Sequence, residues 1–272
     1  MHYSLTRATV WNLAGYIYLI LASLISVPIL VRSLGIDLFG QYSLIIATLT
    51  LVSAINLGLP QAVVRALSYE HGTVKARQAT WATSSQLFIF TGFIAAIISS
   101  FIVYTFHVSF EILPLVFAIG IMGNIVAHYQ TLPHAEGHFG YYNAKTFLVG
   151  TGNTLLAAYL AWVGQGIVAI LSAQLLCYLL TLLILAYFSL KYFPKPWLNK
   201  SSIMVAKSLI SFGLKNQVGT LVGQVQAQYG KYLLASATPA TLSAYLVATG
   251  LVQKAAGAAA PEQPKFKGEY LA

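Results

Sequence analysis

Residues 146–190 decide the fold class: they read TFLVGTGNTLLAAYLAWVGQGIVAILSAQLLCYLLTLLILAYFSL and contain no charged side chain. A transmembrane helix needs about 20 apolar residues, because it rises about 1.5 Å per residue through a hydrocarbon core about 30 Å thick. The stretch is too long for one crossing and suits two, with Gly164-Gln165-Gly166 as the turn between them. It therefore predicts transmembrane helices at residues 146–163 and 167–190.

The composition of the whole chain indicates the same class. Of its 272 residues, 58% are hydrophobic and 8% are charged, and the mean hydropathy is +0.74. Soluble domains carry about 25% charged residues, so the apolar excess must face lipid. Further apolar runs predict helices at residues 10–31, 39–64, 79–106, 112–130, 209–235 and 242–260. We therefore predict an all-α integral membrane protein, a polytopic bundle of about eight transmembrane helices.

The loops between these helices differ in charge. The chain has 15 Lys and Arg against six Asp and Glu, and the short cytoplasmic loops of membrane proteins collect Lys and Arg. One set of alternate loops holds only Arg32 and Lys231. The other set holds Arg7, Arg65, Lys75, Arg77, Lys145, Lys191, Lys195, Lys200 and Lys207. The second set marks the cytoplasm and predicts a cytoplasmic N-terminus. No basic stripe with interleaved aromatic residues lies on a polar element, so we predict no nucleic-acid partner.

Several polar side chains fall at membrane depth, where such groups usually face the bundle interior or a watery cavity. The helix at 39–64 contains Asn56, Pro60 and Gln61 and is followed by Arg65. Pro60 removes a backbone donor, so this helix is either bent along a polar path or ordinarily kinked near its end. Asn124 shares a helix face with His128. That face either lines a cavity or lies in an interfacial band, and we favour the band.

The predicted helix at 209–235 is less apolar than the others. It contains Lys215, Asn216, Gln217 and Gln224. Lys215 is either an inward-facing cation for an anionic substrate or a lysine that reaches back to the cytoplasmic surface. A separate stretch places His134 and His138 on either side of Glu136. That spacing suits metal ligands, but the stretch is a predicted loop without a protease motif, so we predict no metal site and no cofactor.

Short motifs near the N-terminus indicate a family. LGIDLFGQY at 34–42 is followed by NLGL at 56–59 and by the basic Arg65. This order resembles the start of polysaccharide transporters, the O-antigen and exopolysaccharide flippases of the multidrug/oligosaccharidyl-lipid/polysaccharide superfamily. Their pattern is LG-x-x-x-[FY]-G-x-[YW], then a glycine-containing helix end and a basic residue. SFGL at 211–214 and SAY at 243–245 repeat it more weakly. The family often has an aspartate between its seventh and eighth spans, where this chain has YGKY at 229–232.

The resemblance implies a transporter built from two lobes. The first, six-helix lobe would span residues 1–190, and a basic cytoplasmic loop would follow at 191–208. The second lobe would begin with two helices at 209–260, before a polar tail at 261–272. Since family members typically have more spans than this chain, we expect it to be truncated in the second lobe.

The resemblance also implies a function, which is transport rather than enzymatic catalysis. The chain would move a polyprenyl-diphosphate-linked oligosaccharide across the bacterial cytoplasmic (inner) membrane by alternating access, with the polysaccharide polymerase and chain-length proteins as possible partners. Basic residues near a central cavity would attract the diphosphate and acidic sugars, and amides would bind sugar hydroxyls. The candidate residues are Arg65, Lys215, Arg32, Lys254, Asn56, Gln61, Asn124, Asn216 and Gln224.

Three functions other than that of a flippase are compatible with a chain of this class. A cation or drug antiporter of the same superfamily is disfavoured by the basic surplus and by the missing carboxylates at membrane depth. A membrane polymerase or glycosyltransferase would need a sizeable outer loop or an acidic catalytic pair, which the predicted topology does not provide. A truncated fragment without transport activity stays open.

Overall fold

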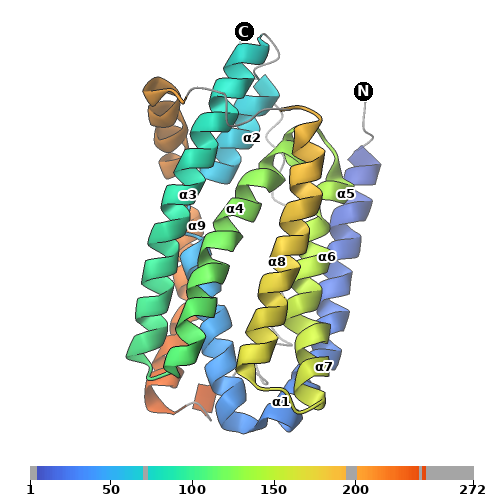
Figure 1. Cartoon of the computed structure of the whole chain (residues 1–272), viewed down its shortest axis with the longest axis vertical. Helices are drawn as coiled ribbons and strands as arrows, with labels where there is room; N and C mark the ends of the chain where they lie inside the picture. Colours follow the sequence, from blue (N-terminus) through green and yellow to red (C-terminus); the bar gives the residue numbers. More distant parts are fainter. Residues whose placement is uncertain (1–4, 70–72, 194–200, 239–240, 243–272) are drawn as a thin grey trace.

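The computed structural model describes residues 5–69, 73–193, 201–238 and 241–242. These residues form helices and turns without a strand among them, which confirms the all-α class (Figure 1). The α-helices are α1 Leu5–Ser53, α2 Leu59–Tyr69, α3 Val74–Thr105, α4 Leu113–Ala135, α5 Phe139–Tyr142, α6 Ala144–Thr151, α7 Ala157–Trp162, α8 Ile167–Leu190 and α9 Ile203–Ala237. A π-helical turn at Gly152–Leu156 joins α6 to α7.

Within the described part of the chain, four helical segments are long and apolar enough to cross a membrane: Thr9–Ser53, Val74–Thr105, Phe110–Ala135 and Ile167–Leu190. Their most apolar windows have mean hydropathies of 2.0 to 2.5. Large apolar side chains also cover the outside of the bundle, such as Phe101 and Leu183, each 66% exposed. An apolar exterior of this kind suits lipid rather than water. The chain is therefore a helical membrane protein, whereas the count of eight spans stays a prediction. The predicted helix at 242–260 lies outside the described residues except for Leu242.

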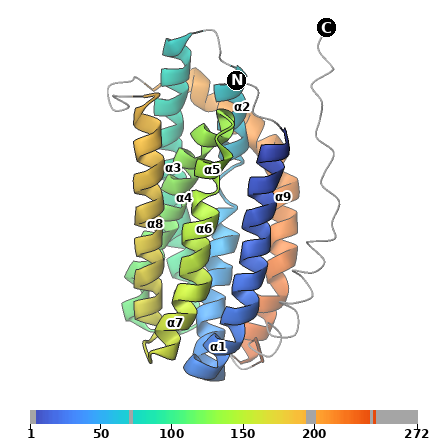
Figure 2. The same cartoon turned by 90° about the vertical axis from the view of Figure 1, so that its right-hand side faces the viewer.

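The first long helix doubles back on itself. Gly35 interrupts α1 with φ 78° and ψ 165°, so the two arms, residues 5–34 and 36–53, run in opposite directions (Figures 1 and 2). That backbone region is essentially restricted to glycine. The turn agrees with the predicted helices at 10–31 and 39–64, and it lies at the same end of the bundle as the α7–α8 turn.

We expect Gly35→Ala to destabilise the protein by about 1–3 kcal/mol, because an L-residue is strained at this φ and ψ. The change should lower the thermal unfolding midpoint of the detergent-solubilised protein. Gly166→Ala is the matched control, since Gly166 lies in the α7–α8 turn with a negative φ and its added Cβ would meet no atom within 4 Å. Equal midpoints for the two variants would contradict the role assigned to Gly35.

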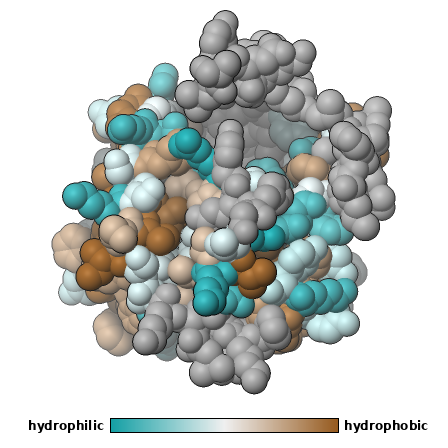
Figure 3. All heavy atoms as spheres, turned by 90° about the horizontal axis from the view of Figure 1, so that it is seen from above, coloured by the Kyte–Doolittle hydropathy of each residue, from teal (hydrophilic) through white to brown (hydrophobic). Residues whose placement is uncertain are grey.

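The opposite end of the bundle carries α2, α5 and the beginnings of α3 and α9. Hydrophilic side chains gather in several places on this end face (Figure 3). Lys75 lies in the first turn of α3 and Lys191 directly follows α8, and both of these helix ends lie at this face. The two lysines belong to the set predicted to mark the cytoplasm, whereas Arg32 lies beside the Gly35 turn at the other end. The structure thus places Lys75 and Lys191 at the end of the bundle opposite to Arg32, and the cytoplasmic N-terminus stays a prediction.

Two apolar clusters hold the helices together. One lies between α1, α4, α7 and α8 and includes Ile45 and Ile170, both fully buried. The second joins α2, α3, α4, α8 and the start of α9 at the opposite end. Trp81 is its largest fully buried side chain, stacked on Phe193 with ring centroids 5.1 Å apart and lying 4.0 Å from the His128 ring. At the edge of this cluster, Arg77 of α3 forms an ion pair with Glu136 at the end of α4.

The predicted helix at 39–64 is divided in two. Its regular backbone stops at Ser53 and resumes at Leu59, and in between Leu57 and Gly58 have φ values of 56° and 65°. The side chain of Asn56 accepts a hydrogen bond of 3.2 Å from the Gly58 N–H. Pro60 therefore lies in the first turn of α2, where its missing N–H costs no helical hydrogen bond. The division precedes the proline because it is made by left-handed residues rather than by the proline ring.

Candidate binding cavity

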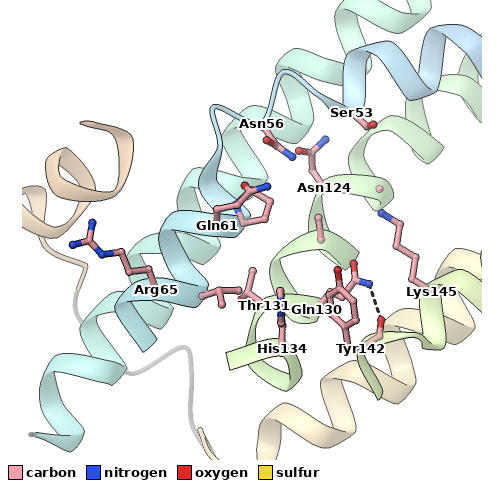
Figure 4. A pocket seen from close by; sticks show the side chains of 14 residues that line it. Ser53, Asn56, Gln61, Arg65, Asn124, Gln130, Thr131, His134, Tyr142 and Lys145 are labelled. Atoms are coloured by element: carbon pink, nitrogen blue, oxygen red, sulfur yellow. Dashed lines mark hydrogen bonds between the residues drawn. The ribbon is translucent and has the colours of Figure 1, made fainter. Parts of the chain in front are cut away.

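The helix break opens onto a cavity of about 460 Å³ between the end of α1, α2, α4 and the α5–α6 segment (Figure 4). A volume of this order is typical of small-molecule binding sites. Fourteen residues line it: Ser53, Asn56, Pro60, Gln61, Val64, Arg65, Gly123, Asn124, Ala127, Gln130, Thr131, His134, Tyr142 and Lys145. Four of the nine candidates predicted from the sequence, Asn56, Gln61, Arg65 and Asn124, are among them.

The wall formed by the break and α2 contributes amides and a cation. Asn56 is half-buried and faces Asn124 of α4 across the cavity (Figure 4). Arg65 lies at the edge, and its guanidinium points away from the cavity toward α9. Its Cζ atom is 4.3 Å from the centroid of the Phe212 ring, which is a cation–π distance. Arg65 thus marks the rim rather than the centre.

The facing wall belongs to α4. Asn124 is 3% exposed and its amide donates a hydrogen bond of 3.2 Å to the Gly120 carbonyl. The Gln130 amide donates one of 2.7 Å to the Tyr142 carbonyl, and the ring of His134 lies 4.5 Å from that of Tyr142. His128, which shares a face with Asn124, is buried in the second apolar cluster at 2% exposure. Both side chains lie inside the bundle, so the interfacial band favoured from the sequence is wrong for this face.

Lys145 is a basic lining residue that was not among the candidates from the sequence. It lies in the first turn of α6, is half-buried, and points into the cavity toward Asn124 (Figure 4). In the sequence, Lys145 stands out only as one of the loop charges that predict the orientation. Its position directly before the uncharged stretch at 146–190 is a signal that could have found it. A lysine at that end of a membrane helix either points inward or reaches the surface, and packing decides which.

The remaining candidates lie elsewhere. Lys215 and Asn216 are exposed on α9, and Gln224 is half-buried on the same helix. Arg32 is exposed beside the Gly35 turn, and Lys254 lies outside the described residues. None of the four described residues among these lines the cavity described above.

The charge of the lining has one sign. It contains Lys145, with Arg65 at the rim, and no Asp or Glu occurs among its fourteen residues. A lysine in a partly desolvated cavity favours an anionic ligand, because its attraction to the anion is less screened than in water. The amides of Asn56, Gln61 and Gln130 add hydrogen-bonding capacity for neutral polar groups. The arrangement suits a ligand with an anionic part and a polyhydroxylated or otherwise polar part.

Fold and cavity together define the class: a helical membrane protein with a polar, cationic cavity inside an apolar bundle. Comparison with protein families identifies the group within this class. The family described as "Polysaccharide biosynthesis protein" matches residues 5–257, and the chain belongs to it. This confirms the resemblance seen in the motifs at 34–42 and 56–65. Searches of curated proteins and of solved structures each found no match.

Proposed function

We propose that the chain is a flippase that moves a lipid-linked oligosaccharide across the bacterial inner membrane, and that the cavity binds the polar head of this lipid. The observation that carries the proposal is the lining of the cavity, which places Lys145 and several amides inside an apolar bundle without an acidic side chain among the lining residues. Membership of the polysaccharide biosynthesis family supports the substrate class.

The parts of such a lipid match the parts of the cavity. A diphosphate would accept charge-assisted hydrogen bonds from Lys145, which are stronger than neutral ones. Sugar hydroxyls would bond to Asn56, Gln61 and Gln130. A cavity of about 460 Å³ is of the size that holds a drug-sized group, so it would take the diphosphate and the sugar nearest to it rather than a whole oligosaccharide. Arg65 at the rim would attract the anionic head on its way in.

Transport of this kind breaks no covalent bond, so we do not propose an enzyme. The cavity would face the cytoplasm first, because Arg65 and Lys145 belong to the charge set that predicts the cytoplasmic side. Alternating access would then expose it to the other side as the lobes rock. The polysaccharide polymerase and chain-length proteins are the expected partners downstream.

Export of a drug or another cation is the second candidate from the same superfamily. A cationic substrate would need a carboxylate at membrane depth to offset its desolvation. The lining has no carboxylate and carries Lys145 instead, which would repel a cation. The charge of the cavity therefore favours the lipid-linked anion.

Complementation tests the proposal. A bacterial strain that lacks its O-antigen flippase would express either this chain or a version extended through a full second lobe, and surface polysaccharide would be measured. We expect restoration by at least one of them. Restoration by the extended version alone would show that this chain needs a longer second lobe. If neither restores the polysaccharide while both reach the membrane, the flippase proposal is wrong.

A further inference from the structure

The broken segment, residues 54–58 between α1 and α2, lines the cavity on one side. Its other side, together with α2, packs against α9. Three contacts follow one another along both elements. Arg65 lies over the Phe212 ring, Gly58 meets Gly213, and the Gln217 amide donates a hydrogen bond to the carbonyl of Ala54. The wall that contains Asn56 and Gln61 is therefore also the docking surface of α9.

The contact between Gly58 and Gly213 is made by backbone alone. A Cβ atom placed on Gly213 would lie 2.2 Å from the carbonyl oxygen of Leu57, and one placed on Gly58 would lie 2.3 Å from the carbonyl oxygen of Gly213. Real Cβ atoms do not approach backbone this closely. Only glycine on both elements allows this approach, so even an alanine would push α9 and the cavity wall apart.

Gln217 supplies a donor that the break requires. The carbonyl of Ala54 lies just beyond the regular part of α1, where helix ends leave carbonyl groups without an intrahelical partner. An unpaired carbonyl is costly inside a bundle. Gln217 is 3% exposed and its side-chain amide bonds to this carbonyl. A residue of α9 thus completes the hydrogen bonding of the broken segment.

The segment is also strained in a way that needs external support. Leu57 has a φ of 56°, a left-handed conformation that leucine rarely adopts. Such residues persist only where their surroundings determine the backbone, and they occur often at functional sites. The surroundings of Leu57 include Gly213, whose added Cβ would first strike the Leu57 carbonyl. The break is therefore held in place partly by α9.

We infer that Gln217 and Gly213 are positioning residues of the cavity: they hold the broken backbone that places Asn56 and Gln61 in its wall. When α9 moves away, the segment loses a donor and a close contact, and the wall rearranges. By thermodynamic reciprocity, a ligand that favours this wall also favours the docked position of α9. The inference rests on the proposed function only in treating the cavity as a binding site.

The position of the cavity wall can be tested without a ligand, through the reactivity of a thiol placed in it. In the full chain carrying Cys177→Ser, which removes the single cysteine, Gln61→Cys provides one reporter thiol. The rate of its modification by a water-soluble methanethiosulfonate is measured in lipid nanodiscs. We expect Gly213→Ala and Gln217→Met each to change this rate by about threefold or more, in either direction, which is the scale of mutations that shift a two-state element. Gln61 is exposed at the cavity in the intact protein, so a displaced wall changes its access to the reagent.

Two matched controls lie on the same helix. Gly219→Ala adds a Cβ that meets no atom within 4 Å, and Gln226→Met removes an exposed amide. Both should leave the rate unchanged. If Gly213→Ala fails to fold, Gln217→Met tests the inference alone. Rates that match those of the controls would overturn it. Binding of undecaprenyl diphosphate to the parent protein, measured separately, reports on the proposed function, so the two failures are distinguishable.

Discussion

Replacing Lys145 by glutamine is expected to reduce surface polysaccharide in the complementation assay by about tenfold or more. Lys145 points into the cavity, and no acidic side chain lines the cavity with it. A hydrogen bond to a charged group contributes about 1.5–3 kcal/mol, and 1.4 kcal/mol corresponds to a tenfold change in affinity. Glutamine keeps much of the length and the hydrogen-bonding capacity and removes the charge, so the loss reports on the anion.

The matched control is Lys207→Gln, because Lys207 is exposed on α9 and does not line the cavity. This control should restore surface polysaccharide as the parent does. It is made in this chain or in the extended version, depending on which of the two is active. Lys215→Gln compares the candidate from the sequence with the one from the structure. A larger loss with Lys215→Gln than with Lys145→Gln would contradict the anion-binding role proposed for the cavity. It would assign that role to the exposed surface of α9 instead.

Replacing Trp81 by alanine is expected to give the largest loss of stability, about 3–5 kcal/mol, the usual range for a buried aromatic residue. Trp81 is 1% exposed, stacks on Phe193 and contacts His128. No neighbour can fill the space of an indole without shifting a helix, so a void remains. Reversible unfolding in detergent, followed by circular dichroism, measures the loss.

Trp162→Ala is its control, since Trp162 is 72% exposed at the end of α7. The same atoms are removed there without leaving an internal void, so the change in unfolding free energy should be well below that for Trp81. Equal losses would show that the second apolar cluster does not set the stability of the bundle, and that the tryptophans act through the surrounding lipid or detergent.

The helices could be predicted where the signal was local. The predicted helices at 146–163 and 167–190 correspond to α6–α7 and α8, with the turn at Gly164-Gln165-Gly166 as expected. Hydropathy decides such elements because a chain in lipid must satisfy its backbone within each helix. The motif at 34–42 is also a local signal, and it places Gly35 in the loop between the first two predicted helices.

The cavity could be predicted only in part. Asn56, Gln61 and Asn124 are polar groups at membrane depth, and the family resemblance made them candidates for binding sugar hydroxyls. All three line the cavity. Lys145 and Lys215 carried the same local signal, a lysine near the end of a predicted helix. The described structure directs one into the cavity and leaves the other exposed. Packing of the neighbouring helices decides which way a flexible lysine points.

The class of protein, the positions of most helices and the family could be read from the sequence, because they depend on composition, on hydropathy along the chain and on short motifs. The place where the second predicted helix breaks, and the set of side chains that share a cavity, depend on how the helices pack. The break is supported by Gln217 and Gly213, which belong to a helix far along the chain. A local sequence pattern cannot predict a contact between residues so distant in sequence. Pro60 therefore marked the region of the break but not its place.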